Sequence, residues 1–396
     1  MNVLFLTLCD IDSFEEHHIY CDLLREFKRD GHDVYCISPV ERRTGIRTHL
    51  TENGRILKLR ILNTQKTNFI EKGISTVLID SWFKRAIKRY FGKVKFDLVL
   101  YSTPPITFVN SIRYVRKRDN ARTYLMLKDI FPQNALDLGI LRKSGLTGFL
   151  YRYFRKKETL LYSISDKIGC MSQANIQYVV KNNPDVPVGK LELCPNCMEY
   201  QDVSLSDKRP LREKYGIPVD KTMFVYGGNL GKPQGIPFLI EALKTQINHP
   251  EAFFLIVGSG TEYSTVDAFI KETSPSNIKL MQTMPKDDYD RMIAACDVGL
   301  IFLDYRFTIP NYPSRLLSYM QAELPILACT DTCTDIRETI EEGDFGWWCP
   351  GNDVKTFSEL IQTILQSDLK QKGRNAKQYL MEHFSSAKVY KDMSIH

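Results

Sequence analysis

A glycine-rich segment in the second half of the chain directly follows an apolar run. Residues 225–235 read VYGGNLGKPQG, and the apolar-periodic stretch IPFLIEAL comes next. Glycine lets backbone N–H groups approach an anion because no Cβ stands in the way, and a following helix presents unpaired N–H groups and the positive end of its dipole. The segment therefore predicts a phosphate site. A plain tight turn fits the same residues, and they match neither the P-loop nor GxGxxG.

A cationic side chain opens a second predicted helix, within residues 311–322, NYPSRLLSYMQA. Ser314 is a candidate N-cap, with its hydroxyl at the first turn. Arg315 in that turn opposes the helix dipole unless an anion bridges the two. A diphosphate would do so, whereas the ordinary alternative is an exposed arginine paired with a surface carboxylate.

Two further candidate residues stand in the first half. Lys128 and Asp129 follow an apolar run at 123–127. Asp129 could accept the proton of a substrate hydroxyl, because a carboxylate within hydrogen-bond reach can act as a general base. The alternative is an aspartate that caps the next helix.

The loop of residues 10–18, DIDSFEEHH, carries further polar side chains. His17 and His18 could contact an acceptor, although histidines beside carboxylates are usually just solvated. Asp10 and Asp12 match a metal-binding DxD pattern only superficially. No convincing cluster of metal ligands appears, so we expect no metal.

Apolar runs that alternate with longer amphipathic stretches must position these residues. The pattern is typical of parallel sheets with helices on both faces, and both halves show it. It predicts an α/β protein with two doubly wound, Rossmann-like domains. The predicted strands are 3–8, 33–37, 97–101, 123–127, 167–171 and 190–193 in the first half, and 222–226, 253–257, 278–281, 298–302 and 325–328 in the second.

Length also favours two domains, because 396 residues exceed the size at which one core usually stops growing. A polar segment at 199–210 is the predicted linker. The predicted domains are residues 1–198 and residues 199–379, and the family resemblance given below implies that they are an acceptor-side and a donor-binding domain. A C-terminal helix at about 380–396 could pack back on the first domain.

The cellular location is read from cysteines and apolar runs. Ten scattered cysteines and no export signal indicate reduced thiols in the cytoplasm. Cys194 and Cys197 have CxxC spacing without a second pair, which indicates a structural turn. No run approaches the ~20 apolar residues that cross a bilayer, so membrane contact would be peripheral.

A Rossmann dehydrogenase is disfavoured because no glycine follows the first strand until Gly31.

Four phrases in the second half, YGGNLG, FFLIVGSGTE, ACDVGLIFL and PSRLLSYMQAELPILAC, resemble retaining GT-B glycosyltransferases of family 4, of the type that builds bacterial capsule and O-antigen polysaccharides. In the first half FDLVLYSTPP, LKDIFPQNALDLG, CMSQANIQYV and LCPN resemble the acceptor-side domain of the same enzymes. The resemblance spans nearly the whole chain, although each phrase is short.

The resemblance implies a GT-B fold, two Rossmann-like domains facing a central cleft, and a hexosyltransferase-type enzyme. The enzyme would transfer a sugar from a nucleotide-diphosphate sugar to a glycan or polyprenyl-diphosphate-linked acceptor, with retention and without a metal. Arg315, Ser314 and Lys232 would neutralise the diphosphate, and Asp129 would serve catalysis. The donor-binding set is Gly227, Gly228, Asn229, Leu230, Gly231, Glu262, Ser314, Arg315 and Ser318, and the acceptor-side set is His17, His18 and Lys128.

This sequence departs from the family pattern at two places. Many relatives carry Arg and Lys where Asn229 and Gln234 stand here. Many also carry two glutamates eight positions apart, and Ser318 replaces the second. Ribose recognition by a carboxylate is therefore in doubt. A non-hydrolysing sugar-nucleotide epimerase and a non-catalytic subunit of a polysaccharide assembly complex remain alternatives.

The two halves differ in charge, and the difference bears on the partner. Residues 1–200 hold 32 Lys+Arg against 21 Asp+Glu, whereas the rest hold 21 against 26. Two aromatic and basic segments lie in the basic half, Trp82–Lys95 and Tyr151–Lys157. On a helix, Trp82, Phe83, Ala86, Ile87, Tyr90 and Phe91 form one apolar stripe. We expect contact with an anionic membrane there, or packing of the stripe on the protein's own sheet, and no nucleic-acid partner.

Overall fold

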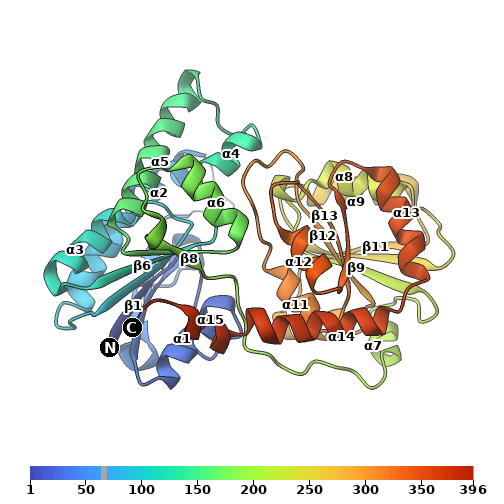
Figure 1. Ribbon diagram of the computed structural model, residues 1–396, viewed down its shortest axis with the longest axis horizontal. Coiled ribbons are helices and arrows are strands. Elements are labelled where there is room, and N and C mark those ends of the chain that lie inside the picture. Colours follow the sequence, from blue (N-terminus) through green and yellow to red (C-terminus); the bar gives the residue numbers. More distant parts are fainter. Residues whose placement is uncertain (64–68, 396) are drawn as a thin grey trace. The chain divides into compact units, whose positions relative to one another are not determined.

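The computed structural model describes residues 1–63 and 69–395, and these form two compact units. Unit 1 comprises Met1–Glu199 together with the segment from Ser386 onward, and unit 2 comprises Tyr200–Ser385 (Figure 1). Within the described residues, no helix is long and apolar enough to cross a membrane.

Unit 1 is built on an eight-stranded sheet in the order β3-β4-β2-β1-β5-β6-β7-β8, parallel except at the β3–β4 pair. Its strands are β1 (Asn2–Leu6), β2 (Asp33–Glu41), β3 (His49–Thr51), β4 (Ile56–Ile61), β5 (Leu98–Ser102), β6 (Arg122–Leu127), β7 (Lys167–Cys170) and β8 (Leu191–Leu193). Its helices are α1 (Ile19–Arg29), α2 (Phe69–Tyr90), α3 (Val109–Asp119), α4 (Gln133–Asp137), α5 (Gly145–Ile164), α6 (Gln173–Asn182) and α15 (Ser386–Asp392).

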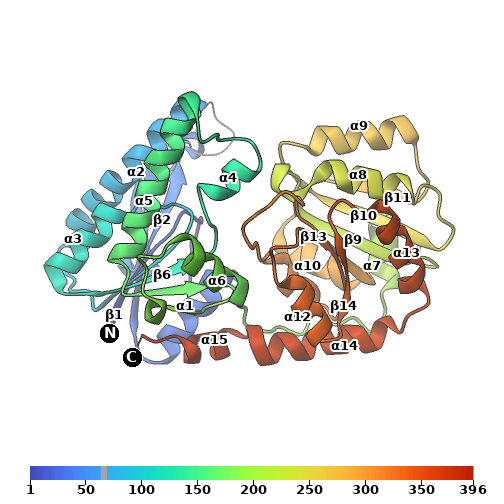
Figure 2. The ribbon, with the colours of Figure 1, turned by 45° about the horizontal axis from the view of Figure 1, so that its top comes forward.

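Unit 2 is built on a six-stranded parallel sheet in the order β11-β10-β9-β12-β13-β14 (Figure 2). Its strands are β9 (Thr222–Asn229), β10 (Ala252–Ser259), β11 (Ile278–Met281), β12 (Val298–Phe302), β13 (Ile326–Thr330) and β14 (Gly346–Pro350). Its helices are α7 (Arg209–Lys214), α8 (Ile236–Lys244), α9 (Tyr263–Thr273), α10 (Lys286–Ala294), α11 (Arg315–Gln321), α12 (Ile336–Glu342), α13 (Val354–Leu365) and α14 (Leu369–Tyr379), which a π-helical turn extends (Leu380–Phe384).

Each unit thus has a parallel sheet with helices on both faces, as the alternating pattern predicts. Every predicted strand is present, with ends shifted by a few residues. The edge strands β3 and β14 are additional, and so is β4, which lies between β3 and β2. Cores form where the buried faces of β strands meet helices, such as the stacked pair Phe224 and Phe254 in unit 2, whose ring centroids lie 5.0 Å apart.

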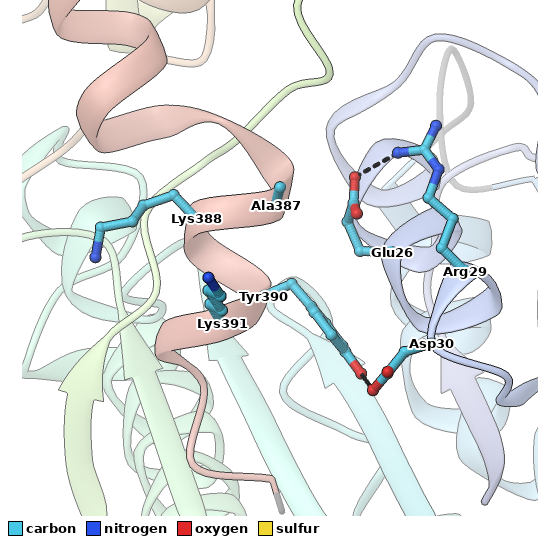
Figure 3. Close-up of a pocket in the computed structure, with 7 residues that line it drawn as sticks. All are labelled: Glu26, Arg29, Asp30, Ala387, Lys388, Tyr390 and Lys391. Carbon is cyan, nitrogen blue, oxygen red and sulfur yellow. Dashed lines mark hydrogen bonds and ion pairs between the residues drawn. The ribbon is translucent and has the colours of Figure 1, made fainter.

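The segment after Ser385 belongs to the core of unit 1. Tyr390 of α15 meets Phe27 of α1 with ring centroids 4.7 Å apart, and its hydroxyl donates to Asp30 at 2.6 Å. Figure 3 shows Tyr390 and Asp30 among the residues that line a surface pocket between the two helices. The Ser386 hydroxyl donates to Glu26 at 2.8 Å. Residues 380–384, by contrast, lie in unit 2.

Candidate functional site

The glycine-rich segment lies at the carboxyl end of β9, the central strand that pairs with both β10 and β12. Gly227 and Gly228 close the strand, and Gly228 has φ +125°, a conformation that side chains other than glycine rarely adopt. A Cβ placed on Gly228 would lie 3.4 Å from Nη2 of Arg315. The backbone of the loop and the guanidinium of Arg315 are therefore neighbours.

The Arg315 guanidinium lacks a carboxylate partner in the part of the chain that the structure describes. Its Nη1 is buried without a hydrogen-bond partner, and its Cζ lies 4.6 Å from the centre of the Tyr226 ring. Burial lowers the pKa of Arg315, but the neighbouring Tyr226 and Tyr319 outweigh it, so the pKa is raised. The ordinary alternative, a surface arginine paired with a carboxylate, does not describe this side chain.

Two tyrosines that sequence reasoning missed hold this arrangement. The Tyr319 hydroxyl accepts from the Gly227 amide at 3.0 Å and donates to the Leu300 carbonyl at 3.2 Å. The Tyr226 hydroxyl donates to the Asn229 carbonyl at 2.7 Å. Tyr319 follows Arg315 by four residues and so shares its face of α11, a spacing from which it could have been found.

A third tyrosine approaches from α10. A Cβ on Gly227 would collide with the hydroxyl of Tyr289, at 1.5 Å. Glycine is thus required at this position for a side-chain contact, independently of any ligand.

The polar residues of the loop bind one another. Asn229 Nδ2 donates to Gln234 Oε1 at 2.9 Å, and the Gly231 amide donates to the same oxygen at 3.3 Å. Asn229 and Gln234 thus fix the loop. Lys232 lies in the 3-10 turn Lys232–Gln234 with an exposed side chain.

Of the remaining predicted donor-binding residues, Glu262 contacts the loop, whereas Ser314 and Ser318 lie at and beyond the start of α11. The Glu262 amide donates to the carbonyl of Leu230 at 2.9 Å, which brings the start of α9 against the loop. Ser314 occupies the N-cap position of α11, but its side chain makes no capping hydrogen bond and is exposed, so the predicted capping role is wrong. Ser318 is half-buried one turn further along α11.

In unit 1, Asp129 lies just beyond the carboxyl end of β6. Its backbone amide donates to Thr103 Oγ1 at 3.0 Å, and its carboxylate accepts from Asn134 Nδ2 at 2.8 and 2.9 Å. Burial raises the pKa of Asp129 to about 6, against hydrogen bonds from Ile130 and Asn134 that lower it. Pro132, and not Asp129, occupies the N-cap position of α4.

The predicted acceptor-side cations and histidines have structural contacts. Lys128 Nζ donates to the Cys194 carbonyl at 2.8 Å. His18 is the N-cap of α1, where its Nδ1 accepts from the Tyr20 amide at 3.3 Å. His17 Nδ1 lies 3.9 Å from the buried Asp22 carboxylate. Contact of these side chains with an acceptor stays a prediction.

Asp10 and Asp12, the DxD-like pair, are both bound to one cation. Lys58 of β4 is 2% exposed, and its ammonium forms ion pairs with Asp10 and, at 2.7 Å, with Asp12. The ammonium also donates to the Ile11 carbonyl at 3.0 Å. The pair thus compensates a buried lysine. In residues 1–63 and 69–395 no group of three or more His, Cys, Asp or Glu could hold a metal ion.

Most of the apolar stripe of Trp82–Lys95 packs inside unit 1, as the alternative to membrane contact expects, whereas Trp82 and Tyr90 are half-buried. Membrane contact through this helix stays a prediction. Phe83 and Ile87 of α2 are fully buried, and Phe83 meets Phe108 with ring centroids 4.5 Å apart. Phe91, beyond the helix, packs edge-on against Tyr35 at 5.5 Å. The predicted helical periodicity is confirmed, and most of the stripe covers the protein's own core.

Residues 207–380 match the family described as glycosyl transferases group 1. They form a glycosyltransferase group 1 domain. The match lies within unit 2 and includes the glycine-rich loop and Arg315.

Relatives of the glycosyltransferase extend the likeness beyond this domain. The chain is 24% identical over 324 residues to the probable glycosyltransferase WbjE of Pseudomonas aeruginosa, covering 81% of this chain and 79% of that protein. It is 25% identical over 231 residues to the putative colanic acid biosynthesis glycosyl transferase WcaI of Escherichia coli, covering 57% of this chain and 54% of that protein.

A solved structure shows the fold. HepE of Anabaena in complex with UDP-glucose matches with a TM-score of 0.68 at 15% identity, covering 99% of this chain and 97% of that one. The predicted GT-B fold is confirmed, and so is the predicted enzyme class, a hexosyltransferase-type glycosyltransferase.

Proposed function

We propose that this glycosyltransferase transfers a sugar from a nucleotide-diphosphate sugar to a glycan or lipid-linked acceptor in cell-surface polysaccharide biosynthesis, with retention at the anomeric carbon. The observation that carries the donor assignment is the buried, unpartnered Nη1 of Arg315 beside the open backbone of Gly228. A buried cation without a counterion is costly, and an incoming diphosphate would remove that cost.

The likeness to other proteins supports the same donor class. HepE was solved with UDP-glucose, and WcaI carries a name from colanic acid biosynthesis. Arg315 would bind a uridine-diphosphate sugar and a guanosine-diphosphate sugar alike, because its guanidinium would contact only the phosphates.

In the proposed reaction the bond between the anomeric carbon and the diphosphate oxygen breaks, and a bond to the acceptor oxygen forms. The nucleoside diphosphate leaves with the electron pair, and Arg315 and Lys232 stabilise the charge that develops on it. Asp129 takes the acceptor's hydroxyl proton. A pKa of about 6 keeps Asp129 ionised at neutral pH and closer to the optimum for a base than an ordinary aspartate.

We further propose that the enzyme works on the cytoplasmic side of the cell membrane. All ten cysteines are free thiols, including Cys329 and Cys349, whose sulfurs lie 3.4 Å apart without a bond. Reduced thiols in such proximity are typical of a reducing compartment.

The test compares nucleotide binding and turnover in wild type and an Arg315→Ala variant. Calorimetric titration with UDP and GDP should show binding of one of them to wild type and strongly weakened binding to the variant. Turnover should fall by ~10²- to 10³-fold, because one donor to a developing charge is commonly worth that much. The matched control is Arg337→Ala, an exposed arginine of the same unit that pairs with Glu341.

Two results would contradict the proposal. Turnover of Arg315→Ala within a factor of two of wild type would remove the diphosphate assignment. Consumption of the donor with conversion to an isomeric nucleotide sugar in the absence of acceptor would indicate an epimerase, whereas dependence on acceptor is the result expected here.

A further inference from the structure

Large apolar side chains are exposed around the amino-terminal end of α5. The exposed fraction is 67% for Phe149, 44% for Leu150 and 52% for Ile140 in the preceding loop. Single exposed apolar residues are ordinary on protein surfaces, but a local group of them marks an interaction site. We define the α5 patch as Ile140, Arg142, Lys143, Phe149, Leu150 and Arg152.

The loop that carries half of the patch is fixed in place. Leu138 and Leu141 on either side of Ile140 are buried, and the amides of Ile140 and Leu141 both donate to the Ala135 carbonyl, at 2.9 and 3.0 Å. Because its neighbours are anchored, Ile140 is held outward. Its exposure is a property of the folded loop.

The loop also lies directly against the helix. A Cβ on Gly148 would be 2.7 Å from the Lys143 carbonyl oxygen, so only glycine lets α5 approach this closely. Arg152 Nη1 donates to the same oxygen at 3.5 Å. The loop that carries Arg142 and Lys143 therefore packs against the first turns of α5. The chain between α4 and α5 lies at the upper tip of unit 1 in Figures 1 and 2.

The charged side chains within the segment that carries the α5 patch have one sign. Residues 138–157 contain six Lys and Arg and no Asp or Glu. The cations of the patch, Arg142, Lys143 and Arg152, are exposed. A second copy of this surface would bring cations against cations, and a free polyanion would leave Phe149 and Leu150 in water.

We propose that the α5 patch docks on a lipid bilayer that contains anionic headgroups, with Phe149 and Leu150 inserted among the lipids and the three cations against the phosphates. This occupant satisfies both the apolar and the cationic part. The location differs from the helix of Trp82–Lys95, most of whose apolar stripe the protein covers itself.

The topology of unit 1 gives the docking a catalytic meaning, which rests on the proposed function. The chain leaves β6 at Leu127, passes Asp129 and α4, and enters α5, which returns to β7. The amino-terminal end of α5 thus lies at the same edge of the sheet as Asp129. A bilayer on the α5 patch would present a lipid-linked acceptor to the side of unit 1 that carries the proposed base.

The experiment is co-sedimentation of the full chain with phosphatidylcholine vesicles, with and without phosphatidylglycerol, at low and high salt. Binding should require phosphatidylglycerol and weaken with salt. Exchange of Arg142, Lys143 and Arg152 for Gln should lower partitioning by about fivefold per cation, because each contributes ~1 kcal/mol near anionic lipid. Phe149→Ser with Leu150→Ser should lower it independently of salt.

The matched control changes Arg85, Lys88 and Arg89 of α2 to Gln, which removes the same charge from exposed positions of the same unit. It should bind vesicles like wild type. Transfer to a water-soluble acceptor should be unchanged in all variants, and thermal unfolding should be as well, since Phe149 is mostly exposed.

Several outcomes would overturn the proposal. These are equal binding to neutral and anionic vesicles, equal loss in the α2 control and the α5 variant, and unchanged binding after the Phe149 and Leu150 exchange. Loss of a wild-type dimer in Phe149→Ser during size-exclusion chromatography would show that the patch joins two copies instead. Failure of transfer with intact vesicle binding would count against the proposed function and leave the docking surface standing.

Discussion

At the scale of single residues, the structure separates groups that bind ligands from groups that only compensate one another. Arg315 is half-buried, and its Nη1 is buried without a hydrogen-bond partner, whereas the fully buried Lys58 has two carboxylates. Only the first would gain a partner from an incoming anion, and this difference supports the proposal that Arg315 binds the donor while Lys58 belongs to the scaffold.

The raised pKa of Asp129 predicts a specific pH dependence of turnover. A base with a pKa of about 6 is protonated and inactive below that pH, so kcat should rise with pH and level off above about 6. Asp129→Asn should lose about 10²- to 10⁴-fold in turnover and with it the acidic limb of the profile. Asp137→Asn, on the neighbouring helix α4, is the control and should keep both. An unchanged acidic limb in Asp129→Asn would remove the residue from catalysis.

The same pKa predicts an effect on stability. The folded protein holds a proton on Asp129 more tightly than the unfolded chain, whose aspartates titrate near 3.8. Folding is therefore favoured by this group at low pH, and the contribution is lost as pH rises from about 4 to about 6. Denaturant titrations of wild type and Asp129→Asn at both pH values should show the free energies of unfolding diverging in that direction.

At the scale of elements, the loop after β9 depends on backbone approach. Gly228→Val should abolish nucleotide binding, because Cβ would enter the space 3.4 Å from Arg315 and φ +125° is strained for valine. Titration with the nucleotide that binds wild type measures the effect. Gly189→Val is the control, since a Cβ there meets nothing within 4 Å. Retained binding in Gly228→Val would show that the phosphates do not contact this backbone.

Much of the architecture could be predicted from sequence because buried parallel strands are continuous apolar runs. β9 and β12 are such runs, and both were found. β4, with the sequence ILKLRI, carries Lys58 in a buried position. Its compensation by Asp10 and Asp12, nearly fifty positions earlier, is a contact between distant segments that no local pattern reveals.

The candidate site likewise contains residues that a local sequence pattern reveals and residues that it does not. Glycines and the arginine of a helix start have local signatures, so Gly228 and Arg315 were identified. The tyrosines that hold them come from three elements, β9, α10 and α11, and each reads locally as an ordinary core residue. A helical stripe likewise shows that one face is apolar but not what covers it, which is why the same period in α2 suggested a membrane.

At the scale of the whole molecule, we expect catalysis without a divalent cation. Arg315 and Lys232 supply positive charge for the leaving diphosphate, and the DxD-like pair is occupied by Lys58. Turnover should persist after exhaustive chelation with EDTA and dialysis. Activity that disappears with EDTA and returns with manganese would contradict the prediction and require carboxylates of this chain to leave their present partners.

The packing of α15 on α1 has a consequence for synthesis. Val389, Tyr390, Met393 and Ile395 are part of the core that also contains Val3, Phe5 and Phe27. A ribosome makes residues 200–385 before it makes these four. The whole sequence of unit 2 is therefore synthesised before that of unit 1 is complete. Until the segment from Ser386 onward is made, part of the apolar surface of unit 1 stays uncovered. The domain that begins the chain is the one that finishes folding last.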